Sequence, residues 1–185
     1  MFDFNRINFK LVILIIVIAL VTFYGGNYLF NHYNVSQPLI NELIEMEEIK
    51  EVELLTNSGK TDIEIKPDNN IDNFYVFYDR INKIADNHLE DSKGQINILN
   101  NSNQHLEKIY HDIHFALYEG ISSSEFTVMK DNIDEIINNK QLSEYNLWVD
   151  NEKVYLQLVD ANNYLYKIVP RYVSSNSLKR GDIDG

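Results

Sequence analysis

The hydrophobic pattern opens with an apolar run over residues 11–30 that contains no charged residue. From Leu11 to Phe23 the only polar residue is Thr22. A helix of about 20 residues rises about 30 Å, which matches the hydrocarbon core of a bilayer. A soluble core helix of this length would normally carry at least one charge. The run therefore predicts a transmembrane signal anchor over residues 11–30, preceded by a short segment, residues 1–10.

The apolar run is not uniform along its length. Leu11, Ile15 and Ile18 belong to its strongly apolar part, whereas Gly25 and Gly26 make the last third small and more polar. We assign all of these residues to the membrane. Small residues allow two helices to approach closely, so the last third is the expected place for a contact with another helix or for a flexible exit.

A cleaved signal peptide is the alternative to an anchor, because Arg6 and Lys10 give the run a basic start. Cleavage requires small residues at positions −3 and −1. The nearest candidate site places Tyr24 at position −3, so an uncleaved anchor fits better. The next basic residue after the run is Lys50. Because basic residues favour the cytoplasmic side, we predict a cell-membrane protein with a cytoplasmic N-terminus and an extracytoplasmic C-terminal domain.

Beyond residue 30 the pattern alternates between the helical and the strand period. Apolar residues three and four apart predict four helices. These are residues 36–48, residues 71–88, the segment between the capping residues 100–103 and Gly120, and the segment from Ser122 to about residue 137. Period-two alternation predicts six strands. These are residues 52–55, 61–66, 95–99, 145–149, 154–159 and 164–169.

The order of these elements indicates the fold class. Strands joined mostly by hairpins, with helices grouped between them, are typical of an α+β fold. We expect an antiparallel sheet that helices cover on one face and that ends in a three-stranded meander. Residues 31–48 would form a connector and an amphipathic helix, residues 49–173 the domain, and residues 174–185 a flexible polar tail.

Composition narrows the classes of partner and chemistry. Residues 31–185 carry 27 of the 28 acidic residues and 14 of the 16 basic ones. This negative charge repels nucleic acids, which are therefore not expected as partners. The chain has no cysteine. Disulfides, thiol chemistry and zinc–thiolate sites are therefore excluded.

The most suggestive cluster for chemistry lies on the helix that precedes Gly120. Glu107, His111 and His114 fall within about 60° of one another on an ideal helix, so they could bind one metal ion. The alternative is a solvent-facing helix edge on which Glu107 and His111 form an ordinary pair four residues apart. The metal hypothesis would make the protein a metal-dependent enzyme or a metal carrier.

A serine nucleophile is a second hypothesis, because Ser122, Ser123 and Ser124 follow Gly120. A nucleophile elbow places its serine after a strand, whereas these serines follow a helix that Gly120 is expected to end. Ser122 and Glu125 have the spacing of a capping box, so helix capping explains the run better.

A calcium loop is a third hypothesis, for the segment that begins at Asp160. Asp160 and Asn162 have the required spacing, but Tyr164 occupies the next ligand position and no glycine follows it. A hairpin turn between two strands is the better interpretation.

Aromatic residues gather in the segment 74–78 and in the meander, and they supply a candidate interaction surface. Its residues are Tyr75, Phe77, Trp148, Tyr155, Tyr164 and Tyr166. Exposed aromatic patches mark contacts with partners. The alternative is burial, in a helix packed on two sides and in cross-strand pairs of the meander.

The sequence contains no nucleotide-binding loop and no paired-carboxylate motif. We therefore expect a single-pass, membrane-anchored module for binding, sensing or assembly, without catalytic activity and without a cofactor. Its partners would be the bilayer and another protein in or outside the membrane. The alternatives are the metal hypothesis above and a structural subunit of a cell-envelope complex, in which the anchor itself contacts partner helices.

Overall fold

The computed structural model describes residues 9–31, 36–68 and 71–171. The predicted N-terminal segment up to residue 8, most of the predicted connector and the predicted tail over residues 174–185 lie outside these ranges. The described chain has the predicted α+β composition, with two separate three-stranded sheets and five α-helices.

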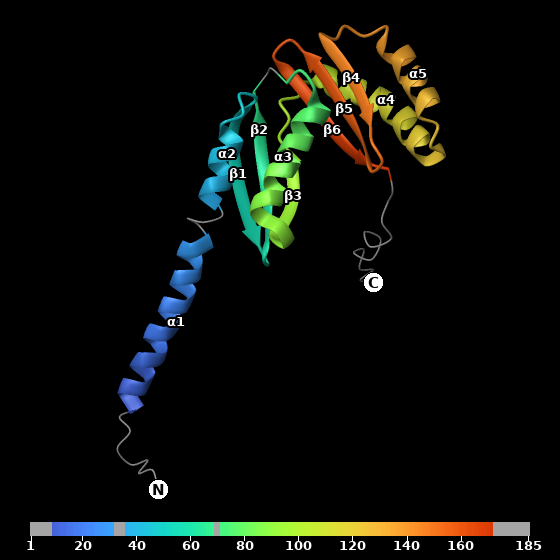
Figure 1. The fold of residues 1–185 in the computed structure, drawn as a ribbon. Coiled ribbons are helices and arrows are strands. Elements are labelled where there is room, and N and C mark those ends of the chain that lie inside the picture. Colours follow the sequence, from blue (N-terminus) through green and yellow to red (C-terminus); the bar gives the residue numbers. More distant parts are fainter. Residues whose placement is uncertain (1–8, 32–35, 69–70, 172–185) are drawn as a thin grey trace.

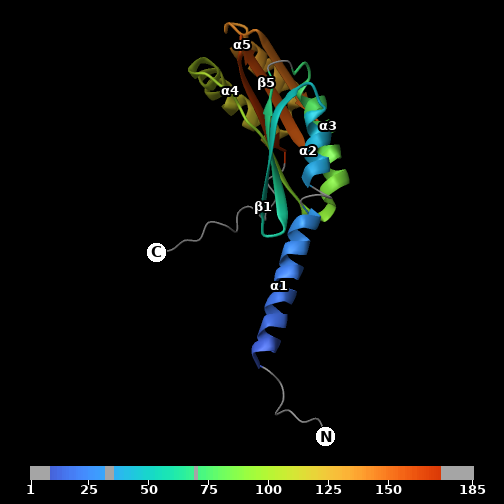
Figure 2. The same ribbon diagram turned by 90° about the vertical axis from the view of Figure 1, so that its left-hand side faces the viewer.

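The first helix, α1 (Phe9–Asn31), lies apart from the rest of the chain in both views (Figures 1 and 2). Its described large apolar side chains, between Val12 and Phe23, are 37–72% exposed. Ile15 and Ile18 are among them, whereas the side chains of Leu11, Gly25 and Gly26 lie outside the described part. When the described residues are searched, none of their helices is long and apolar enough to cross a membrane. The predicted helix is therefore present, and its passage through a membrane stays a prediction.

The amphipathic helix predicted after the connector is α2 (Gln37–Ile44). Pro38 stands in its first turn, where the missing N–H group costs no hydrogen bond. Leu39 and Leu43 are fully buried against α3 (Phe74–Leu89) and β1 (Ile49–Asn57). The helix thus belongs to the core of the domain.

The first sheet has the order β1–β2–β3, with β2 at Lys60–Pro67 and β3 at Lys93–Ile98. β1 and β2 form the predicted hairpin, and Ser58 and Gly59 turn the chain with positive φ angles of 50° and 79°. Ile63 and Ile65 of β2 point into the core, where α2 and α3 cover the same face of the sheet (Figure 2).

The expectation of a purely antiparallel sheet is wrong at β3, which pairs in parallel with β2. Between them α3 carries the chain back along the sheet, and Asn73 caps this helix by accepting a hydrogen bond from the Val76 N–H at 3.0 Å. A crossover of this kind returns the chain to the end of the sheet at which it started. β3 therefore runs in the direction of β2.

The middle of the chain forms a helical pair, α4 (Gln104–Ser123) and α5 (Phe126–Ile137). Asn103 caps α4 as predicted, since its side chain accepts a hydrogen bond from the Leu106 N–H at 2.8 Å. The predicted end at Gly120 is wrong, because α4 continues to Ser123. Gly120 instead permits close packing: a Cβ atom there would lie 2.3 Å from the Cβ of Met129 on α5.

The C-terminal third is the predicted antiparallel meander, with β4 at Glu144–Val149, β5 at Lys153–Asp160 and β6 at Asn163–Pro170. It forms a second sheet of order β4–β5–β6. The prediction that helices cover one face only is wrong for this sheet. Helices α4 and α5 pack on one face, and α3 with the first sheet packs on the other (Figure 1).

Candidate functional site

The predicted metal cluster does not converge on one point. The hydroxyl of Ser102 donates to the carboxylate of Glu107, while Nδ1 of His114 contacts the backbone carbonyl of His111 at 2.6 Å. The two imidazole rings stack with centroids 5.3 Å apart. Over the described ranges no three His, Asp or Glu side chains are placed to hold a metal ion. The geometry of this helix face is that of the alternative, a solvent-facing edge.

The serines end α4 and connect it to α5, a structural role as helix capping suggested, although the predicted capping box does not form. Ser124 ends α4 in the left-handed region, at φ 60°. The hydroxyl of Ser123 donates to the Gly120 carbonyl at 3.4 Å and accepts from the Glu125 N–H at 3.3 Å. These contacts connect α4 to α5, which begins after Glu125 without a side-chain cap.

The predicted calcium segment is a hairpin turn. Asp160 pairs with Asn163 across a two-residue loop in which Ala161 has φ 53°. The carboxylate of Asp160 accepts a hydrogen bond from the side chain of Asn103 at 3.1 Å. The turn interpretation is therefore confirmed.

The candidate aromatic surface is wrong for four of its six members. Phe77, Tyr155, Tyr164 and Tyr166 are at most 4% exposed. The three tyrosines are buried because α3 and the first sheet cover that face of the meander, and Phe77 is buried because α3 directs it into the same core. Tyr75 and Trp148 are half-buried against the same core.

These buried aromatic rings join the two sheets through α3. Phe74 stacks on Tyr166 with ring centroids 4.6 Å apart, and Tyr75 meets Tyr155 edge-on at 5.1 Å. Such pairs stabilise a contact beyond the area that they bury. The alternative of burial is therefore the observed one, with the rings of the meander packed against α3.

Directional hydrogen bonds fix the same junction. Gln157, which is fully buried, accepts from the Phe74 N–H at 3.1 Å and donates to the Ile71 carbonyl at 2.8 Å. The hydroxyl of Tyr164 donates to the Pro67 carbonyl at 3.0 Å. Because buried polar groups are costly to leave unpaired, these contacts hold α3 and β2 in one position on the second sheet.

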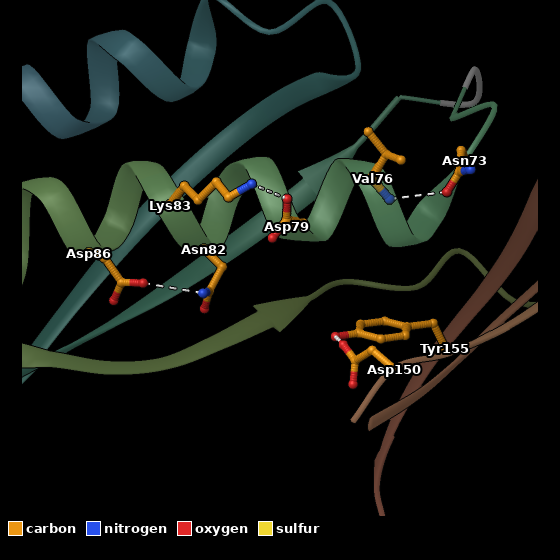
Figure 3. Close-up of polar contacts among 8 residues, drawn as sticks. All are labelled: Asn73, Val76, Asp79, Asn82, Lys83, Asp86, Asp150 and Tyr155. Carbon is orange, nitrogen blue, oxygen red and sulfur yellow. Dashed lines mark hydrogen bonds and ion pairs between the residues drawn. The ribbon is translucent and has the colours of Figure 1, made fainter. Parts of the chain in front are cut away.

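Asp150 and Tyr155 form a further polar contact beside α3 (Figure 3). The Tyr155 hydroxyl donates to the Asp150 carboxylate at 2.8 Å. Burial, followed by this hydrogen bond, raises the pKa of Tyr155, so the hydroxyl remains a donor. Partial burial alone would raise the pKa of Asp150, but the N–H groups of Glu152 and Lys153, together with the Tyr155 hydroxyl, outweigh burial and lower this pKa.

The two sheets meet at one end of their facing edges. Asn101 and Tyr164 form an isolated antiparallel bridge, with the Tyr164 N–H donating to the Asn101 carbonyl at 3.1 Å. At Tyr166 the backbone N–H donates instead to the side chain of Asn100, at 2.6 Å. The replacement of a backbone acceptor by a side chain marks the point from which β3 and β6 diverge.

The space between the diverging strands is the main candidate for a binding site, and we call it the inter-sheet cleft. It consists of two adjoining hollows of about 250 and 620 Å³ that share Ile96, Asn97 and Ile168. Its lining comes from α3 (Phe74, Tyr78, Asn82), from β3 and Asn100, and from the meander (Glu152, Lys153, Tyr166, Lys167, Ile168, Pro170). The cleft therefore has an apolar floor and two strand edges as walls.

Lysines predominate among the charged groups of the inter-sheet cleft. Lys93 contacts the carboxylate of Asp86 at 2.5 Å, whereas Lys153 lies over the ring of Tyr78, 5.1 Å from its centroid. Lys167 lies over the ring of Tyr110 at 5.0 Å. Glu152 is the acidic residue of the lining. The cleft is thus locally basic in a chain of net charge −12.

A separate hollow of about 420 Å³ lies on the open face of the first sheet. Glu53 and Glu64 face each other across its strands, and Lys66 approaches Glu51 to 3.5 Å. Its charged side chains are solvated, and like charges opposite each other favour neither stability nor an acidic ligand. Most of its lining residues are charged, whereas Phe74, Ile96 and Ile168 are among the residues that line the inter-sheet cleft.

Comparisons of the chain with protein families, with curated proteins and with solved structures give no match. The functional argument therefore depends on the geometry of the chain itself.

Sequence reasoning did not predict the inter-sheet cleft, because it placed β3 in one antiparallel sheet with the other strands. One signal could have indicated it. The connection between β2 and β3 contains the 16-residue helix α3, and a crossover between parallel strands requires a connection of this length. Such a crossover leaves β3 at a sheet edge, next to the loop that leads to α4.

Proposed function

We propose that this protein is a single-pass membrane protein that holds a binding domain outside the cytoplasm. The observation that carries the proposal is the exposure of ten large apolar side chains on α1, from Val12 to Phe23, apart from both cores of the domain. Burying an aliphatic side chain of this size stabilises by about 1.5–3 kcal/mol. A bilayer would supply that burial for the whole helix at once.

The charges around α1 support an orientation with the N-terminus inside. Arg6 and Lys10 lie before the apolar run, and no basic residue follows it before Lys50. Basic residues next to a membrane-spanning helix stay on the cytoplasmic side. The domain from α2 onward is then extracytoplasmic.

The inter-sheet cleft supports binding of a protein partner as the role of the domain. Half-buried Ile96, Ile98 and Ile168 lie there beside buried Phe74 and Tyr166. Apolar surface bordered by polar groups is typical of contact sites between proteins. We infer that the domain acts by binding, and that α1 keeps this site at the membrane surface.

Membrane insertion is tested with the full chain in a host membrane. Extraction at alkaline pH should leave the chain in the membrane fraction, and a reporter fused after Gly185 should be accessible from outside the cell. In the variant Ile15→Asp/Ile18→Asp, each charge near the centre of the helix costs about 2.5–3.5 kcal/mol of insertion. Most of this variant should leave the membrane fraction.

The matched control is Val128→Asp, which places a charge at an apolar side chain that is 50% exposed on α5. This variant should stay in the membrane fraction. A wild-type chain recovered without detergent would overturn the proposal, as would a double variant that is retained like the wild type. The intact mass of the recovered chain distinguishes an anchor from a cleaved signal peptide.

A further inference from the structure

We propose that the inter-sheet cleft binds an extended, acidic segment of a partner protein as an added β-strand. The strand would lie between β3 and β6 and connect the two sheets into one. This inference deepens the proposed function. It rests on that function in one respect only, which is that the partner is expected outside the cytoplasm.

Both walls of the cleft are edge strands. The sheet orders β1–β2–β3 and β4–β5–β6 leave β3 and β6 each with one neighbour. Edge strands present unpaired backbone groups that another extended chain can bind. The bridge between Asn101 and Tyr164 is antiparallel, so a strand placed between the walls runs antiparallel to one of them and parallel to the other.

The backbone of β3 is turned toward the cleft at two residues. In the parallel pair, the Leu99 N–H donates to the Ile65 carbonyl of β2 at 2.8 Å. Alternate residues of a strand direct their N–H and C=O groups to opposite sides. The backbone groups of Ile96 and Ile98 therefore point away from β2 and into the cleft.

On the other wall of the cleft, β6 also directs backbone groups toward the position of the added strand. The two-residue loop pairs Asp160 with Asn163, so Leu165 and Lys167 bond to β5 and the residues between them point outward. The outward N–H groups of Tyr164 and Tyr166 are taken by Asn101 and Asn100 at the closed end. The backbone groups of Ile168 are the next ones along the open part of the cleft.

The side chains of the cleft define what the added strand must carry. On the α3 side, Ile96 and Ile168 are half-buried and pack against the core that contains Phe74 and Tyr78. Alternate apolar residues of the added strand would extend this core. Because side chains of a strand alternate between faces, the remaining residues would point away from α3, to the side on which Lys167 lies over the ring of Tyr110 of α4.

Charge complementarity selects an acidic strand. Lys153 and Lys167 line the cleft together with Glu152 and with Lys93, which is paired with the Asp86 carboxylate at 2.5 Å. Lys167 lies on the side to which the acidic residues would point, whereas Lys153 lies over Tyr78 at the open end of the cleft. Neither Lys153 nor Lys167 has a carboxylate within salt-bridge distance among the described residues. The net negative charge of the chain repels an acidic peptide at long range. The lysines offset this repulsion locally, so the cleft prefers an acidic segment to a basic one.

The test uses the full chain in detergent micelles and a blocked pentapeptide of alternating glutamate and valine that carries a fluorescent label. We expect binding by anisotropy, together with slower amide exchange at Ile96, Ile98 and Ile168. Two control peptides have lysine in place of glutamate, or one N-methylated backbone amide. Each should bind at least about tenfold more weakly, because charge pairing or a strand hydrogen bond is lost.

Matched variants locate the site. Lys153→Glu/Lys167→Glu should weaken binding of the glutamate peptide at least about tenfold and favour the lysine peptide. Lys50→Glu, beside the hollow on the first sheet, should leave both affinities unchanged. Thermal melts of each variant confirm that it is folded.

Several outcomes would overturn strand addition. They are absence of binding, binding that leaves the three amides unprotected, and equal binding of the N-methylated peptide. Protection that appears with a concentration-dependent dimer would assign the cleft to a second copy, and protection lost on deletion of residues 172–185 would assign it to the chain's own C-terminal segment. A membrane-retained chain that binds no peptide refutes only this inference, whereas a soluble chain that binds it refutes only the anchor.

Discussion

The two faces of the second sheet are packed by different chemistry. The face toward α4 and α5 is aliphatic, and its buried residues are Val154, Leu156, Leu158, Leu165 and Val169. The face toward α3 and the first sheet is aromatic and polar, and its buried residues are Tyr155, Gln157, Tyr164 and Tyr166. Neighbouring residues of one strand, Leu156 and Gln157, therefore serve two different junctions.

The two faces contribute differently to the fold. The aliphatic face mainly stabilises it, and the polar face fixes where α3 and β2 lie on the second sheet. Aliphatic packing is non-directional, so the α4–α5 face is closed by the fit of its side chains. Hydrogen bonds have a preferred direction, so Gln157 and Tyr164 fix where α3 and β2 lie on the sheet. The bridge between Asn101 and Tyr164 joins the facing edges of the two sheets at one end. At the other end these edges diverge and form the inter-sheet cleft.

The largest expected effect is on the aliphatic face. Leu156→Ala removes a fully buried side chain and should lower the free energy of unfolding by about 2–5 kcal/mol, because a cavity is left between β5 and the two helices. Urea unfolding followed by the fluorescence of Trp148, the single tryptophan, measures this loss. Val149→Ala, at a side chain that is 39% exposed, is the control and should cost under about 1 kcal/mol. Equal losses for both variants would contradict the assignment of Leu156 to a core.

The second effect tests how closely α4 and α5 approach. Gly120→Ala would place its Cβ atom 2.3 Å from the Cβ and 2.5 Å from the Cγ of Met129, so the helices must move apart. We expect a loss of about 3 kcal/mol by the same unfolding measurement. Met129→Gly removes the Cβ and Cγ atoms that would clash, so Gly120→Ala/Met129→Gly should recover part of this loss relative to the sum of the single variants. Strict additivity would show that the two residues are not in contact.

Strong periodicity made most elements of this fold predictable from the sequence. The stripes of α3, α4 and α5 and the alternation of the meander depend on local patterns, and the structure places these elements close to the predicted residues. The direction of β3 was not predictable in the same way, since Ile96 and Ile98 alternate identically in parallel and antiparallel pairs.

Burial on two faces explains why the sequence left both an exposed aromatic surface and burial open. Tyr155 and Leu156 are adjacent and both buried, so alternation along β5 gives no sign of which face is open. The position of the cleft depends on contacts between distant residues, such as Asn101 with Tyr164 and Gln157 with Phe74. No local pattern encodes such pairs.

The third effect is on the polar face. Gln157→Leu keeps the size of the side chain but leaves the Phe74 N–H and the Ile71 carbonyl without their partner. The free energy of unfolding should fall by about 2 kcal/mol, less than for the neighbouring Leu156→Ala. Amide exchange at Phe74 should accelerate more than exchange at Ile113 in α4, which should follow only the loss of global stability. Equal acceleration at both positions would mean that the two faces are not separate junctions.

The smallest effect concerns the edge of the polar face, and it depends on pH. The Asp150 carboxylate accepts from the Glu152 and Lys153 N–H groups, each at 2.7 Å, and from the Tyr155 hydroxyl. These bonds favour the ionised form and lower the pKa of Asp150 in the folded chain. A carboxylate of this kind stabilises the fold above its unfolded pKa of about 3.9 and loses that contribution as the pH falls through the folded value.

Asp150→Asn should therefore cost about 1 kcal/mol at pH 7, a small amount because the site is only partly buried. The difference from the wild type should shrink as the pH falls from about 5 to below 4, where the wild-type carboxylate becomes protonated too. Urea unfolding at a series of pH values measures the difference. Tyr155→Phe, which keeps the charge and removes one donor, should retain most of the pH dependence. A difference between Asp150→Asn and the wild type that stayed constant down to pH 3 would show that the hydrogen bonds do not depend on the ionised carboxylate.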